Sequence, residues 1–213
     1  MKKYLLSVAV LALASMSVFT SCKDDDEIAV PADVTVTVDK AALKTAEADA
    51  AKNAAAEALT AAKATAPADA TVTQDPQTGN ITIKNADNTY TVTTTETSYT
   101  YEIDGVTYNT MEAVQAELAK RPAGSTATVV AVLHQTTTTQ QYNADGTKNG
   151  PATTNEKTTK GKETEIEIPG LDEAPKTAAV ILPTSVTDAT QTKTVDVTVK
   201  TTEKGQHSGG SIN

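Results

Sequence analysis

Residues 99–108, with the sequence YTYEIDGVTY, carry a strong β-hairpin pattern. Tyr99, Tyr101 and Ile103 alternate with polar residues, and this period of two is typical of a half-buried β-strand. Asp104-Gly105 follows directly, and an Asp-Gly pair favours a tight hairpin turn because both of its central positions need positive φ angles. Residues 106–108 then form a short return strand. The stretch predicts an antiparallel hairpin, and we expect the main core to lie around it.

Further strands are predicted on both sides of this hairpin. Their Val, Ile, Tyr and Thr residues alternate, or form short apolar runs, between polar turns at residues 75–80, 85–88 and 143–150. The predicted strands cover residues 34–38, 81–84, 89–95, 126–141, 163–168, 178–182 and 194–200. The sequence therefore predicts a mainly antiparallel β protein.

An Ala-rich helix is predicted near the N-terminus, over residues 40–63. Asp39 offers an N-cap and Pro67 closes the segment. Its only large apolar residues, Leu43 and Leu59, project on nearly opposite sides of a helix. Two arrangements stay open: the helix packs on a sheet through Ala contacts, or it stands as a semi-rigid spacer.

A second, short amphipathic helix is predicted over residues 111–120. Asn109 and Glu112 have the spacing of a capping box, while Met111, Val114 and Leu118 share one helix face. Pro122 and Gly124 then end the helix. With its two helices the chain belongs to the α+β class.

Composition excludes several classes of function. The chain has 213 residues, a net charge of -9, one Cys and two His. A single Cys excludes a disulfide framework and Cys-based zinc fingers within one chain, and the acidic balance argues against nucleic-acid binding. We expect no catalytic site, metal site or cofactor.

Two local patterns come closest to a chemical site. His134 ends an apolar run and is interpreted as structural. Asn143, Asp145 and Gly146 have the spacing of inner positions of a calcium-binding EF-hand loop. Gln141 and Ala152 replace its first and last ligands, which favours a plain turn.

The N-terminus carries a secretory signal. Lys2 and Lys3 precede an apolar segment, residues 5–18, which is too short for a confident membrane span of about 20 residues. Cys22, the only Cys of the chain, follows where this segment ends.

These residues resemble the N-termini of bacterial lipoproteins, and in particular those of Bacteroidetes. Thr20 and Ser21 are the small residues that precede the lipidated Cys in that class, and Phe19 is a Bacteroidetes-like variation. An acidic run similar to the surface-export signal of that phylum follows, formed by Lys23, Asp24, Asp25, Asp26 and Glu27. The resemblance implies cleavage before Cys22, acylation of its thiol, and attachment to the outer membrane at the cell surface. Beyond its signal, the chain is similar in general look to uncharacterised surface lipoproteins of gut Bacteroidetes.

The chain divides accordingly into five segments: a signal peptide (1–21), an acidic tether (22–33), a strand with the Ala-rich helix (34–66), a mainly β domain (67–205) and a flexible tail (206–213). The mature protein is more acidic than the whole chain, because Lys2 and Lys3 leave with the signal.

The expected function is that of a lipid-anchored, non-catalytic surface protein, a binding or adhesion accessory. Its partners would be the membrane, through Cys22, and an extracellular protein or glycan. The candidate binding surface comprises Tyr90, Tyr99, Tyr101 and Tyr108.

The alternative rests on the Thr tracts 93–95, 136–139 and 153–159. Long Thr-rich hairpins resemble the insertion strands of β-pore-forming toxins, which would make the protein membrane-active. The competing interpretation is that these threonines cover exposed sheet faces, which suit β-branched residues.

Overall fold

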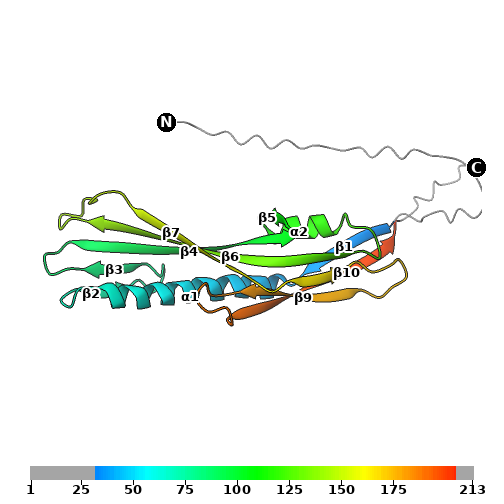
Figure 1. Ribbon diagram of the computed structural model, residues 1–213, viewed down its shortest axis with the longest axis horizontal. Helices are drawn as coiled ribbons and strands as arrows, with labels where there is room; N and C mark the ends of the chain where they lie inside the picture. Colours follow the sequence, from blue (N-terminus) through cyan, green and yellow to red (C-terminus); the bar gives the residue numbers. More distant parts are fainter. Residues whose placement is uncertain (1–31, 205–213) are drawn as a thin grey trace, which may run out of the picture. The chain divides into compact units, whose positions relative to one another are not determined.

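The structure is a computed structural model that describes residues 32–204, which belong to one compact unit. The signal peptide, Cys22, the acidic run and the tail 206–213 lie outside the described residues. The predicted fold class is confirmed in outline, because the described chain is mainly antiparallel β-sheet with two helices (Figure 1).

The larger sheet has seven strands and contains the predicted hairpin. Its main path is β2-β3-β4-β6-β7, with β5 paired to β4 and β8 paired to β6. The strands are β2 (Thr71–Gln74), β3 (Ile81–Lys84), β4 (Tyr90–Ile103), β5 (Val106–Tyr108), β6 (Thr126–Tyr142), β7 (Thr153–Lys160) and β8 (Thr164–Glu167). Strands β4 and β6 pair along the whole of β4, from Tyr90 opposite Tyr142 to Ile103 opposite Val129.

A smaller sheet of three antiparallel strands has the order β1-β10-β9. It consists of β1 (Ala32–Val38), β9 (Lys176–Pro183) and β10 (Thr192–Glu203). Ala32 lies opposite Glu203, so the two ends of the described chain are neighbours.

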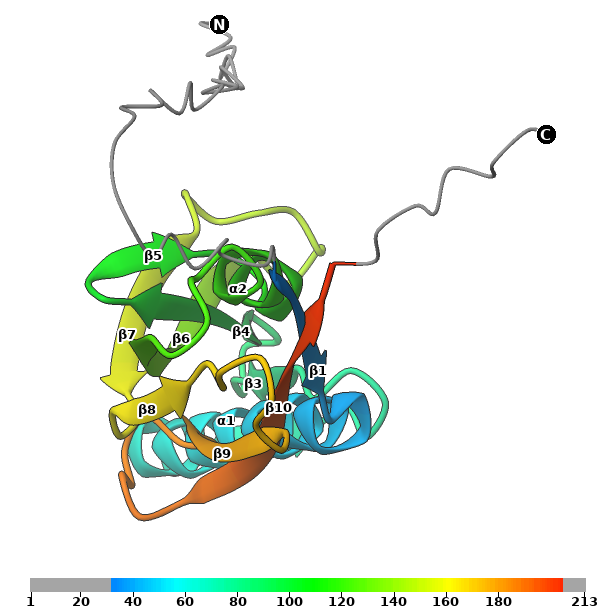
Figure 2. The same cartoon turned by 90° about the vertical axis from the view of Figure 1, so that its right-hand side faces the viewer.

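Helix α1 (Lys40–Thr65) packs against both sheets, principally on β4 and β10. Asp39 caps it, because its carboxylate accepts hydrogen bonds from the backbone N–H groups of Ala41 and Ala42. The buried residues of the helix are Ala46, Ala50, Ala54 and Ala62. The sequence left two arrangements of this helix open. The structure shows that the helix packs on the sheets through its alanines and does not stand as a spacer. Viewed along the strands, α1 lies beside β9 and β10, and its other side faces β4 and β6 (Figure 2).

Helix α2 (Met111–Leu118) begins as predicted, but its N-cap residue differs from the predicted one. Thr110, not Asn109, is the N-cap residue, and its hydroxyl accepts a 3.1 Å hydrogen bond from the N–H of Ala113. Glu112 therefore stands in the first turn instead of completing a capping box. The predicted apolar face consists of Met111, Val114 and Leu118, and all three residues are buried.

The core lies where the two sheets, α1 and α2 meet. On β4 it contains Tyr99, Tyr101 and Ile103, which are all buried, as expected for the stretch that begins the hairpin. The facing residues come from β6, β8, β9, β10 and both helices. Fully buried examples are Leu118, Leu133, Ile166, Leu182, Val195 and Val197.

Candidate binding groove

The inner face of the seven-stranded sheet, the face toward α1, changes character halfway along β4 and β6. Alternate side chains of a strand share a face. On β6 the inward series begins with the buried residues Val129, Ala131 and Leu133 and continues with Gln135, Thr137 and Thr139. On β4 it runs in the opposite direction from Ile103, Tyr101 and Tyr99 to Thr93 and Thr91. One half of the face thus builds the core, while the other half is lined by threonine.

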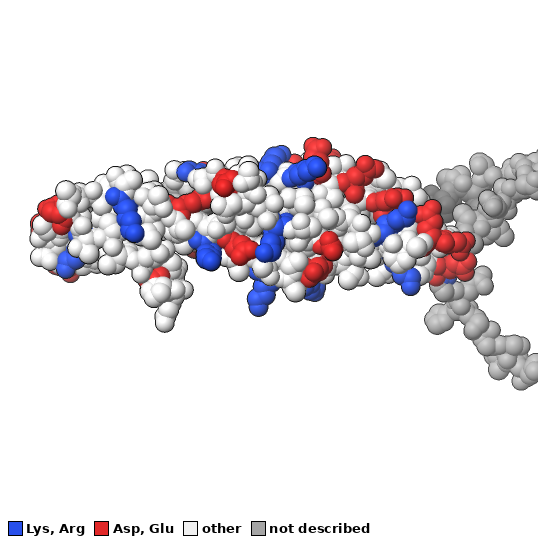
Figure 3. All heavy atoms as spheres, turned by 90° about the horizontal axis from the view of Figure 1, so that it is seen from below, with Lys and Arg blue, Asp and Glu red and all other residues white. Residues whose placement is uncertain are grey.

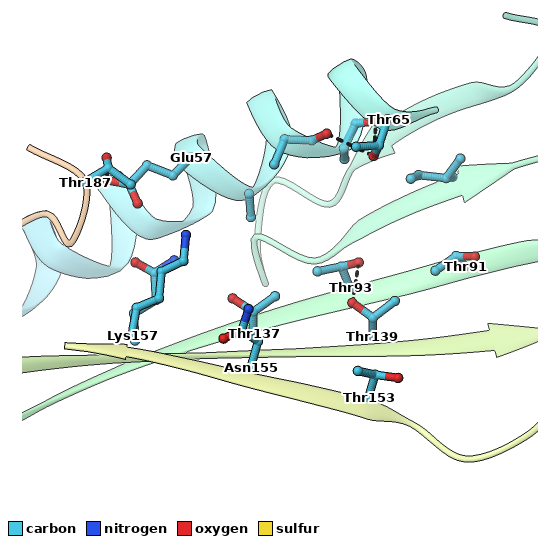
Figure 4. A pocket seen from close by; sticks show the side chains of 15 residues that line it. Glu57, Thr65, Thr91, Thr93, Thr137, Thr139, Thr153, Asn155, Lys157 and Thr187 are labelled. Carbon is cyan, nitrogen blue, oxygen red and sulfur yellow. Dashed lines mark hydrogen bonds between the residues drawn. The ribbon is translucent and has the colours of Figure 1, made fainter. Parts of the chain in front are cut away.

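A groove of about 580 Å³ opens between this threonine half and the C-terminal half of α1. Its roof carries Ala58, Ala61 and Ala62, and its floor carries side chains of β4, β6 and β7 (Figure 4). Alanine above threonine leaves space that Leu or Ile would fill in an ordinary close-packed interior. The volume lies in the range of small-molecule sites, about 300–1,000 Å³.

The floor of the groove consists mainly of side chains that can form hydrogen bonds. Five threonines line it from the three strands, and the hydroxyls of Thr93 and Thr139 lie 3.3 Å apart. Gln135 and Asn155 add side-chain amides, which both donate and accept. Ile83 is the one large apolar residue of the lining, and no aromatic side chain of the described chain belongs to it.

Glu57 and Lys157 bring opposite charges to one end of the groove. The Oε1 atom of Glu57 accepts hydrogen bonds from the hydroxyls of Ser185 and Thr187, whereas its Oε2 atom is buried and has no partner among the described residues. Figure 4 shows Lys157 extending from β7 toward α1, on the side where Glu57 and Thr187 lie. Within the described chain, Lys157 forms no ion pair.

His134 lies on the other, outer face of the sheet and links three strands. Its Nε2 atom is 2.8 Å from the Thr100 hydroxyl of β4, and its Nδ1 atom is 3.1 Å from a carboxylate oxygen of Glu156 on β7. This order of hydroxyl, imidazole and carboxylate resembles a hydrolytic triad. However, Thr100 belongs to a paired stretch of β4, where backbone N–H groups are engaged in the ladder and cannot form an oxyanion hole.

The four tyrosines of the predicted binding surface do not form one exposed surface: Tyr99, Tyr101 and Tyr108 are neighbours at the core, and Tyr90 lies apart from them. Tyr99 and Tyr101 are only 9% and 2% exposed, which contradicts their assignment to a surface. Both face the core because they share the strand face of Ile103. Tyr108 is half-buried against the core, and Tyr90 stacks on Tyr142 with ring centroids 4.8 Å apart.

Two matching turns flank this tyrosine pair; both positions were predicted as polar turns, but their likeness to each other was not predicted. Asn-Ala-Asp-Asn-Thr (85–89) precedes Tyr90, and Asn-Ala-Asp-Gly-Thr (143–147) follows Tyr142. In each turn the Asp carboxylate accepts from the backbone N–H and the hydroxyl of the Thr, and the first Asn donates to that hydroxyl. The repeated pentapeptide was the signal that could have revealed them.

The second turn contains Asn143, Asp145 and Gly146, which have the spacing of a calcium-binding loop. The Asp145 carboxylate is occupied by Thr147, in agreement with the plain turn favoured by the sequence. Over residues 32–204, no group of three or more His, Cys, Asp or Glu side chains is placed to hold a metal ion. No helix in that range is long and apolar enough to cross a membrane.

No protein-family model matches the chain, and neither a curated protein nor a solved structure matches it significantly. The groove and the N-terminal sequence are therefore the observations from which a function can be argued.

Proposed function

We propose that the protein is a lipid-anchored outer-membrane protein, displayed at the cell surface, which binds an extracellular ligand in the groove between α1 and the threonine half of the sheet. Acylation of Cys22 supplies the anchor, and the run of residues 23–27 directs export. Binding needs no catalytic group and no cofactor.

The groove is the observation that carries this proposal. Folding normally fills the space between a helix and a sheet with large apolar side chains, because each buried methylene stabilises the fold by about 0.8 kcal/mol. Here alanine faces threonine, so the chain forgoes that packing and keeps an accessible space with a hydrogen-bonding floor. A ligand-binding role explains this arrangement directly.

The position of the groove along the fold suits a surface-anchored receptor. The chain enters the described fold at Ala32, beside Glu203, and reaches the groove only in the second half of α1. Helix α1 has 26 residues, a length of about 39 Å at 1.5 Å per residue. The groove therefore lies along the half of α1 that is farther in the chain from Ala32, the first described residue.

The anchor is tested by Cys22→Ala, with Ser17→Ala as a control inside the signal. We expect the Cys22→Ala chain to leave the membrane fraction or to stay uncleaved, while the control behaves as the native protein. Protease treatment of intact cells should digest the native protein and spare a variant that lacks residues 23–27. Membrane retention of a correctly cleaved Cys22→Ala chain, or protection of the native protein, would contradict the proposal.

Ligand binding is tested on the full chain in detergent by native mass spectrometry. The probes are tetra-alanine, its N-acetylated form and maltotriose, each offered to the native protein and to Ala61→Phe, which fills the groove. Ala51→Phe, at an exposed position on the same helix away from the groove, is the matched control. We expect at least one probe to bind the native protein and the control, and to bind Ala61→Phe at least tenfold more weakly. Failure of all three probes, or equal binding by Ala61→Phe, would refute the groove as the site.

A further inference from the structure

We infer that the groove binds short peptides in an extended conformation, with the free amino terminus of the peptide held by Glu57. This inference rests on the proposed function, since it names the ligand class of the same groove. It is carried by three features of the lining: a half-satisfied carboxylate, a regular row of hydroxyls, and a roof of methyl groups.

The carboxylate of Glu57 is the first feature. Two hydroxyl donors already engage Oε1, while Oε2 is buried without a donor from the described residues. A buried carboxylate oxygen without a hydrogen-bond donor is energetically unfavourable, and positively charged N–H groups form the strongest hydrogen bonds to it. An α-ammonium group brings three such donors at once.

Thr187 lies directly beside this carboxylate, because its hydroxyl donates a 2.8 Å hydrogen bond to Oε1. Glu57 and Thr187 border both the groove and a second hollow of about 460 Å³ on the neighbouring side of α1. Thr187 is exposed and bonds to Oε1, so its side chain can rotate away and leave the carboxylate to a ligand. Ser185 keeps the carboxylate in place meanwhile, because it is buried and also bonds to Oε1.

Lys157 offers the peptide a second contact, to a carbonyl oxygen next to the amino terminus. It lines the same end of the groove, yet it forms no ion pair within residues 32–204. Its ammonium group donates hydrogen bonds and accepts none. It therefore suits the first carbonyl oxygen of a peptide whose amino terminus lies at Glu57.

The hydroxyl rows of the floor match the repeat of an extended peptide. Thr91 and Thr93 on β4, and Thr137 and Thr139 on β6, stand two residues apart, which is about 6.6–6.8 Å along a strand. The N–H and C=O groups on one edge of an extended peptide recur at the same interval. A hydroxyl donates and accepts, so each can bond either backbone group.

The roof favours a peptide over a sugar. The α1 surface offers the methyl groups of Ala58, Ala61 and Ala62, which leave room for alternate peptide side chains. The lining drawn from the described residues holds no aromatic side chain on which the apolar face of a sugar ring could stack. Hydroxyls, amides and methyl groups together fit a backbone with small side chains.

The test compares tetra-alanine with N-acetyl-tetra-alanine on the full chain in detergent, by isothermal titration calorimetry. Acetylation removes the positive charge and leaves the rest of the peptide unchanged. We expect tetra-alanine to bind the native protein and the acetylated peptide to bind at least tenfold more weakly. Equal affinities for the two peptides would overturn the inference, and this comparison needs no variant.

Variants then locate the amino terminus. Glu57→Gln keeps an oxygen that accepts from Ser185 and loses the charge, so it should weaken tetra-alanine binding at least tenfold and leave the acetylated peptide unaffected. Glu47→Gln, on an exposed part of α1, is the matched control and should bind as the native protein does. Unchanged affinity in Glu57→Gln would refute the assignment of Glu57.

The outcomes separate this inference from the proposed function. If maltotriose binds, is excluded by Ala61→Phe, and neither peptide binds, then the groove is a binding site and the peptide inference is wrong. If none of the three probes binds, both fail.

Discussion

The hydroxyl of Tyr99, on β4, donates a 2.6 Å hydrogen bond to the carbonyl oxygen of Pro183, the last residue of β9. The bond joins the two sheets at the point where the core gives way to the groove. Pro183 is followed by Thr184 and Ser185, which bond to Asn53 and Glu57 of α1. A residue of the core thereby fixes the start of the loop that orients the groove carboxylate.

Tyr99→Phe should lower the free energy of unfolding by about 1–3 kcal/mol, because it leaves the buried Pro183 carbonyl without its donor. The measurement is denaturant unfolding followed by circular dichroism. Tyr142→Phe, which keeps the half-buried stacked ring at the far end of β6, is the control and should change stability by less than about 0.5 kcal/mol. Equal losses of unfolding free energy in the two variants would show that the hydrogen bond to Pro183 does not contribute measurably to stability.

The stability of the fold should fall at alkaline pH because of Tyr99 and Tyr101. Burial holds the pKa of each phenol well above its ordinary value of 10.0, and in Tyr99 the neighbouring Tyr101 adds to the rise. The folded state keeps both protons where the unfolded state loses them. Their contribution is therefore complete below pH 10 and declines as the pH rises through the folded pKa values.

Above pH 10 each tyrosine should lower the free energy of unfolding by up to about 1.4 kcal/mol per pH unit. Urea unfolding between pH 8 and 11.5 measures this slope. The double variant Tyr99→Phe and Tyr101→Phe should show a flatter decline than the native protein. Identical slopes would contradict the pKa assignment.

The sequence predicts best where a large apolar residue marks the inward face. The stretch 99–108 gives the hairpin of β4 and β5, and the run 129–133 gives the centre of β6, because Tyr, Ile, Val and Leu reveal the buried side. Strands β2 and β7 are missed because their residues are almost all polar: β7 reads TTNEKTTK and is exposed along most of its length. An edge strand is defined by its partner, and its own sequence carries little signal.

The candidate site was missed for a related reason. Its lining is Thr and Ala, and at the level of sequence these residues indicate only strand and helix propensity. Glu57 and Lys157 are 100 positions apart in the chain and line the same groove only because α1 packs over the sheet to which β7 belongs. Conversely, the tyrosines were conspicuous in an aromatic-poor chain, but two of them form the core, because aromatic side chains bury large areas.

The close approach of α1 to the sheets should make its Ala stripe intolerant of larger residues. Ala50 is 1% exposed, and its neighbour Ala51 is exposed. Ala50→Leu should lower the free energy of unfolding by about 1–3 kcal/mol through overpacking, whereas Ala51→Leu should stay within about 0.5 kcal/mol of the native protein. Thermal unfolding of the two variants checks this, since they add the same side chain one position apart. Equal stability would mean that α1 can move away from the sheets at little cost.

The two matching turns should behave as independent, equivalent units. The hydroxyl of Thr147, followed by its backbone N–H, lowers the pKa of Asp145 below the ordinary 3.8, and Thr89 does the same for Asp87. Because the folded pKa is lowered, the stabilising contribution of each carboxylate is present above pH 3.8 and is lost as the pH falls through the folded value.

An NMR titration of the side-chain carboxyls measures both pKa values directly. Thr147→Val keeps the shape and the backbone donor but removes the hydroxyl, so the pKa of Asp145 should rise toward its ordinary value. Asp87 should not change, because its partner hydroxyl belongs to Thr89 in the other turn. Thr89→Val should give the reciprocal result. A shift of both carboxyls in either variant would show that the turns are coupled through the stacked pair Tyr90 and Tyr142 that lies between them.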